Sequence, residues 1–188
     1  MSSGDGVPGS PSNSLPHAWH RGPLYRLRGQ PVDVTDRVAS SAMPRTPLSL
    51  AVLNEQRAVL GLPPHTGADE PAALRRAALD TVLGASAEGA EPSRPVVKGA
   101  VRFLLDRLAE LAPGRSVEVR VPPHAAVQCV DGPHHTRGTP PNVVEMDAPT
   151  WIALATGRLA WADAVADGRV RASGARADLS AYLPLPID

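Results

Sequence analysis

The residues whose side chains could do chemistry gather in one loop, Asp131–Pro141. The loop carries His134, His135 and Arg137, and Asn142 follows it directly. In a loop that glycine and proline stiffen, such side chains can simply satisfy nearby backbone groups. They can also form the polar rim of a ligand site, where Arg137 would meet an acidic head group. The residues alone leave both interpretations open.

Metal binding and nucleophilic catalysis both fit this region poorly. The spacing from Cys129 to His134 and His135 is that of half a zinc site, but zinc needs three or four ligands and the sequence offers no matching second pair. Cys129 also lies in an apolar stretch, whereas a reactive thiol sits at a helix N-terminus or beside a cation. No phosphate loop, dinucleotide-binding fingerprint or nucleophile elbow occurs. We therefore predict no catalytic residue, no metal, no cofactor and no enzymatic activity.

A second group of candidate residues is apolar and lies near the C-terminus. Its members are Trp151, Leu154, Leu159, Trp161, Val165, Leu179, Tyr182 and Leu183. Taken one at a time, each is explained by packing in a hydrophobic core. Taken together, they can also line a cavity for a nonpolar ligand, since small-molecule sites are mostly apolar with a few polar groups. We keep both interpretations.

The elements that must position these residues follow from hydrophobic periodicity. Apolar side chains recur at helical spacing in three segments, which are residues 47–60, 72–83 and 95–111. Glycine or proline follows each of them and predicts its end. Three strands are predicted at residues 117–121, 125–130 and 143–146.

After residue 146 the predicted order is helix, helix, strand and a last amphipathic helix that carries Leu179, Tyr182 and Leu183. Asp147 stands where an N-cap would accept orphan backbone N–H groups. Gly157 stands where the first helix needs a left-handed C-cap. Asp167-Gly168 ends the second helix at residue 166, and a strand begins at Val170.

This order resembles the C-terminal half of the sterol carrier protein fold. The residues that carry the resemblance are Asp147, Thr156-Gly157-Arg158, the run from Ala164 to Val170, and Ser173-Gly174. The stretch from Gln128 to Asn142 is similar to the bacterial branch of that family. The resemblance covers about residues 95–185. It implies an α+β domain, a small sheet covered by helices, with a hydrophobic tunnel between the C-terminal helices and the sheet.

Composition divides the chain into three predicted parts. Residues 1–42 are rich in Ser, Gly and Pro and lack an apolar stripe, which predicts a disordered tail. Residues 43–94 are predicted to form a helical extension and a linker, and residues 95–188 the sterol-carrier-like domain. The 19 basic residues equal the 19 acidic ones, which argues against nucleic acid as a partner. Without an apolar run of membrane-spanning length or a secretory signal, we expect a cytoplasmic protein with no stable membrane insertion.

The function that these patterns predict is non-catalytic binding or transfer of a nonpolar ligand such as a lipid, an acyl chain or a sterol-like molecule. The alternative is a structural or regulatory module that binds a protein partner, because sterol-carrier-like domains also occur as parts of larger enzymes. An enclosed cavity would favour the carrier. A filled core with an exposed apolar face would favour the partner module.

Overall fold

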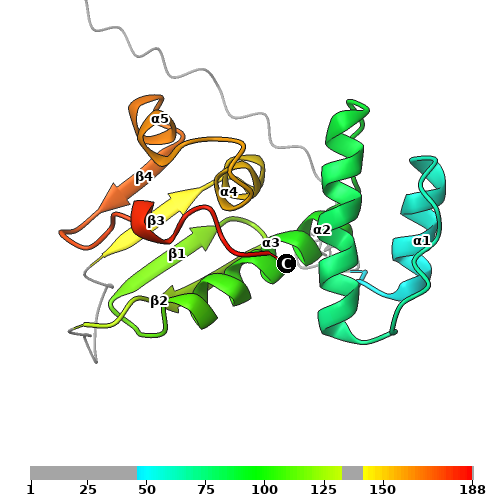
Figure 1. The fold of residues 1–188 in the computed structure, drawn as a ribbon, viewed down its shortest axis with the longest axis horizontal. Coiled ribbons are helices and arrows are strands. Elements are labelled where there is room, and N and C mark those ends of the chain that lie inside the picture. Colours follow the sequence, from blue (N-terminus) through cyan, green and yellow to red (C-terminus); the bar gives the residue numbers. More distant parts are fainter. Residues whose placement is uncertain (1–45, 133–141, 188) are drawn as a thin grey trace, which may run out of the picture. The chain divides into compact units, whose positions relative to one another are not determined.

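The fold consists of a four-stranded mixed sheet and the helices that pack with it (Figure 1). The structure is a computed structural model that describes residues 46–132 and 142–187, and all of these belong to one compact unit. The elements in chain order are α1 (Leu50–Val59), α2 (Pro71–Ala87), α3 (Arg94–Leu111), β1 (Val117–Val121), β2 (Ala125–Cys129), β3 (Val143–Met146), α4 (Ala148–Ala155), α5 (Trp161–Ala166), β4 (Val170–Ser173) and the 3-10 turn η2 (Ser180–Tyr182). Helices α3, α4 and α5 cover one face of the sheet, and helices α1 and α2 pack beside α3. The predicted α+β class is therefore confirmed.

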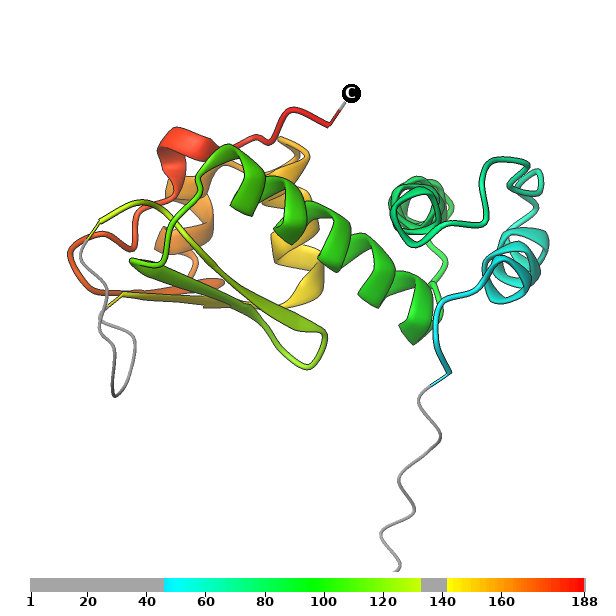
Figure 2. The same cartoon turned by 90° about the horizontal axis from the view of Figure 1, so that it is seen from below.

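The strands lie in the order β2-β1-β3-β4. β1 pairs antiparallel with β2 and parallel with β3, while β3 pairs antiparallel with β4. Side chains alternate along β1, so Val117, Val119 and Val121 are buried. Helices α3, α4 and α5 lie on that face (Figure 2).

The opposite face of the sheet is charged. Arg120 of β1 stands opposite Glu145 of β3, which stands opposite Arg171 of β4. Arg120 also donates from Nε to Glu118 Oε1 at 2.6 Å. Because charged side chains dominate this face, it is suited to contact with water.

Helix α3 is the central support of the domain. Its apolar stripe, which includes Leu104, Leu105 and Leu108, is buried. It contacts β2 and α4 on one side and α2 on the other. Gly99 lets α2 come close, since an added Cβ there would lie 2.9 Å from the Cβ of Ala78.

The N-terminal helices join the same hydrophobic core. Leu53 of α1 and Leu79 of α2 are fully buried in the cluster that also contains the sheet valines. The link between α1 and α2 is partly polar, since Arg57 donates from Nη1 to Thr81 Oγ1 at 2.9 Å. The C-terminal segment reaches back to α2, where Arg76 donates to the carbonyl of Ile187.

Two element boundaries differ clearly from the sequence-based prediction. Helix α2 was expected to end before Gly84, but it continues to Ala87. Thr81, Val82 and Ala85 are buried around that glycine, and their packing outweighs the roughly 1 kcal/mol cost of glycine in a helix. Glycine inside a helix is therefore no stop signal when its neighbours pack.

The last amphipathic segment was expected to be a helix, and it forms only the 3-10 turn Ser180–Tyr182. Pro184 explains this, because the residue before a proline is pushed out of the helical region. Leu183 accordingly has extended dihedrals, φ −114° and ψ 142°. The smaller deviations are a start of α1 at Leu50, capped by Ser49, and an end of β2 at Cys129 before Val130 with φ 61°.

The predicted caps are confirmed. Asp147 Oδ1 accepts the backbone N–H of Thr150 at 2.8 Å. Gly157 has φ 73° and Gly168 has φ 68°, both in the left-handed region. The predicted tail, residues 1–42, lies outside the described residues.

Candidate functional site

Helix α4 positions the largest of the predicted ligand contacts. Asp147 fixes where the helix begins, and Gly157 turns the chain after it ends. Between them, Trp151, Ile152 and Leu154 are buried against the rest of the domain. The caps fix the two ends of the helix, and six of its eight residues are buried.

The structure brings most of the predicted apolar residues together. Trp151, Leu154 and Leu179 are buried members of the main hydrophobic cluster. Four more are half-buried and pack against it, namely Leu159, Trp161, Tyr182 and Leu183. Val165 is apart from them, with 42% of its surface exposed on α5.

Trp151 has one unsatisfied polar atom. Its side chain is fully buried, yet the indole Nε1–H has no hydrogen-bond partner within residues 46–132 and 142–187. Leaving a buried donor unpaired costs about 1–3 kcal/mol. A ligand oxygen or a bound water would remove this cost.

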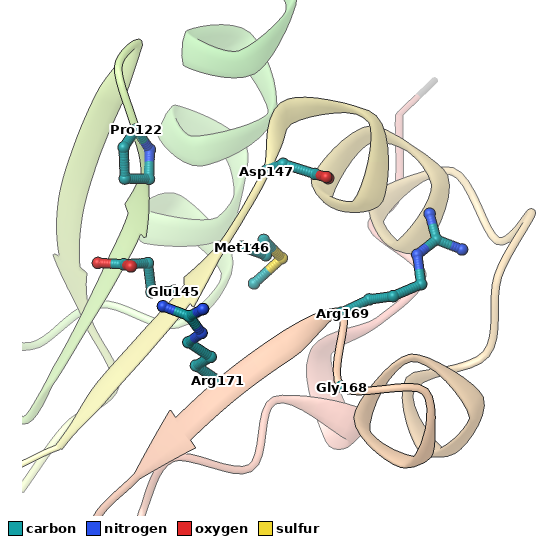
Figure 3. A pocket seen from close by; sticks show the side chains of 7 residues that line it. All are labelled: Pro122, Glu145, Met146, Asp147, Gly168, Arg169 and Arg171. Atoms are coloured by element: carbon teal, nitrogen blue, oxygen red, sulfur yellow. The ribbon is translucent and has the colours of Figure 1, made fainter.

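A pocket of about 310 Å³ lies where β1 and β3 end and β4 begins (Figure 3). It is open to solvent and adjoins the N-terminus of α4. Its lining residues are Pro122, Glu145, Met146, Asp147, Gly168, Arg169 and Arg171. Met146 is almost fully buried and supplies an apolar wall. The pocket thus combines an apolar contact with two arginines and two carboxylates.

Residues of the chain hold the charged groups of this pocket in place. Arg169 donates from Nε to Thr150 Oγ1 at 3.3 Å, and Thr150 is fully buried. Arg171 and Glu145 are register partners on neighbouring strands, so their side chains share one face of the sheet. Asp147 is engaged as the cap of α4.

The arginines of the pocket were missed by the sequence-based prediction. A signal existed, because Arg169 and Arg171 flank Val170 where a strand was expected, and Val170 is buried. Arg171 follows Val170 within β4 and therefore points away from the core. Arg169 precedes the strand and points toward α4 instead (Figure 3). What the sequence did not indicate is that Thr150 lies beside Arg169.

The predicted polar rim is described only in part. His134, His135 and Arg137 lie outside the described residues. Asn142 is almost fully buried, donates from Nδ2 to the carbonyl of Ser116 at 2.7 Å and accepts the N–H of Arg176 at 3.0 Å. Its amide therefore already ties the start of β1 to the segment after β4.

Cys129 is buried and His124 is partly buried, and burial shifts the pKa of both. Burial raises the pKa of the Cys129 thiol to about 11, so the thiolate is scarce at neutral pH. Burial, followed by the positive charges of Arg94 and Lys98, lowers the pKa of His124. In the part of the chain that the structure describes, no three His, Cys, Asp or Glu side chains gather as metal ligands would.

Residues 93–185 match the family model described as "Bacterial SCP ortholog". This range agrees with the stretch that carries the sequence resemblance. No curated protein matches the chain. Among the described residues, no helix combines the length and the apolar character that crossing a membrane requires.

Proposed function

Residues 93–185 of this chain form a domain of the bacterial SCP ortholog family, and from this membership we propose that the chain binds a nonpolar ligand between its C-terminal helices and its sheet. The ligand is a lipid, an acyl chain or a sterol-like molecule, and it is held without chemical change. The observation that carries the proposal within the domain is the buried Trp151, whose indole N–H lacks a partner among the described residues.

The ligand would lie beside the half-buried apolar residues at the margin of the core. Leu159, Trp161, Tyr182 and Leu183 pack against the main cluster while keeping part of their surface exposed. An acyl chain placed over them gains about 0.8 kcal/mol per buried methylene. A chain of ordinary length would then bind with micromolar affinity after the cost of association is subtracted.

Entry of the ligand requires the segment 177–184 to move. The side chain of Leu179, which belongs to this segment, is fully buried and occupies space that the ligand would need. Among the described residues, the backbone hydrogen bonds of this segment are local, from Ala177 to Gly174, from Tyr182 to Leu179 and from Leu183 to Ser180. Side-chain packing is what holds it to the domain. We propose that this segment moves while Leu185 keeps its end anchored.

A structural or regulatory module that binds a protein is the second candidate. The closed packing of Trp151, Leu154 and Leu179 favours it, because a filled core needs no ligand. The charged face of the sheet does not favour it, since an apolar docking face is missing there. The two candidates differ in whether an apolar probe binds at all.

A fluorescent fatty-acid probe titrated with the full chain tests the proposal. We expect micromolar binding that Leu183→Arg weakens, because Leu183 is half-buried at the proposed site. Val59→Arg is the control, since it places the same charge on a side chain that is 78% exposed and part of α1. A probe that stays free at about 100 micromolar protein would favour the partner module.

A further inference from the structure

Arg169 is the polar feature of the pocket beside α4 that the proposed function does not use. Its Nε is bonded to the buried Thr150 hydroxyl at 3.3 Å. Within the described residues its two terminal nitrogens form no hydrogen bond, and no ion pair of Arg169 is present. These two nitrogens form the fork with which arginine binds carboxylates in bidentate geometry.

The surroundings of Arg169 favour an anion although the formal charges of the pocket cancel. The register partners of Glu145 on both neighbouring strands are arginines, Arg120 and Arg171. Asp147 accepts the N–H of Thr150, and its charge is offset by the positive end of α4. Neither Arg169 nor Arg171 forms an ion pair among the described residues. Of the two, Arg169 is the one whose guanidinium a buried hydroxyl holds in place.

The pocket also offers an apolar contact next to this charge. Met146 lines it and is almost fully buried, and Pro122 lines it from the end of β1 (Figure 3). A free inorganic anion gains nothing from such a wall. A ligand with a charged end and an apolar body uses both features.

We propose that this pocket binds the carboxylate head group of a chain-like nonpolar ligand, with Arg169 as the anion-binding residue and Thr150 as the residue that positions it. The inference rests on the proposed function, because the body of the ligand is the molecule held by the C-terminal helices. It adds a chemical class to that ligand, namely an acid in place of an alcohol or a sterol.

The test compares decanoate with 1-decanol, which share a chain and differ in charge at the head. Both are titrated calorimetrically into the full chain and into Arg169→Gln. We expect decanoate to bind about fivefold more weakly to Arg169→Gln, the size of effect expected for a solvent-exposed charge pair. Binding of 1-decanol should be unchanged. Arg102→Gln removes the same charge from an exposed site on α3 and should change neither affinity.

Two further variants separate anion binding from a structural role. Arg169→Lys keeps the charge but loses the fork, so it should restore part of the affinity for decanoate. Thr150→Val removes the hydroxyl with little change of shape and should weaken decanoate less than Arg169→Gln does. If both ligands weaken equally in Arg169→Gln, the residue acts on the fold and the head-group site is refuted.

The outcomes also separate this inference from the proposed function. Equal binding of decanoate by the natural chain and by Arg169→Gln, with 1-decanol still bound, would overturn the head-group site alone. Failure of the natural chain to bind either molecule would overturn the head-group site and the proposed function together.

Discussion

Leu185 donates its backbone N–H to the carbonyl of Ala155 at 2.9 Å, and this bond joins the C-terminal segment to the end of α4. The Leu185 side chain is buried in the main cluster. Two α-helices hold the residues that follow, since Arg107 donates to the carbonyl of Pro186 and Arg76 to that of Ile187. Leu185 is thus part of the core of the domain, and hydrogen bonds tie the two residues after it to α3 and α2.

Leu185→Ala should lower the free energy of unfolding by about 2–3 kcal/mol, because it removes buried methyl groups and leaves a void. Val59→Ala, at a site that is 78% exposed, should change it by less than about 0.5 kcal/mol. Urea denaturation of the full chain measures both. Equal stability of the two variants would show that the segment does not pack as described.

The two glycine caps give a prediction about backbone strain. Gly157→Ala and Gly168→Ala should each destabilise the domain by about 1 kcal/mol, because a Cβ disfavours positive φ. At Gly168 a new Cβ would meet no atom within 4 Å, so the cost there comes from the backbone alone. Gly168→Asn should cost less than Gly168→Ala, since asparagine tolerates this region better. Thermal unfolding of the three variants measures these differences in stability. A Gly168→Ala variant as stable as the natural chain would contradict the left-handed cap at this position.

His124 makes the stability depend on pH. Because its pKa is lowered in the folded state, the unfolded chain binds the proton more readily. Stability from this residue is complete above the ordinary histidine pKa of about 6.5 and is lost as the pH falls through the lowered folded value.

We therefore expect the melting temperature of the natural chain to fall between about pH 7.5 and pH 5, and that of His124→Asn to fall less. Every other titrating group is common to both chains and cancels in the comparison. Parallel pH profiles would mean that the His124 imidazole is as accessible to protons in the folded state as in the unfolded one.

Local signals predicted the strands and the caps well. Alternating valines sufficed for β1, and Asp147 and Gly157 lie at the ends of α4 as expected, because each acts through its own backbone. The errors arose where distant contacts decide. Gly84 stays helical because α2 is packed on both sides of it, and only the fold shows that packing.

The candidate site was less predictable than the fold. Residues such as Trp151 and Leu179 were expected at the C-terminal helices, and they do share one cluster. Their periodicity cannot distinguish a lining residue from a filling one, since both are apolar. The Arg169–Thr150 contact joins residues 19 positions apart, and only the pairing of β3 with β4 brings them together.

Native mass spectrometry of the full chain, purified from the organism that makes it, tests the central claim most directly. Carrier function predicts a population with the added mass of a nonpolar molecule, which extraction with organic solvent releases. The same preparation of Leu183→Arg should lose that population, and Val59→Arg should keep it. A bare chain in every preparation, together with a fatty-acid probe that stays free, would contradict ligand binding by this domain.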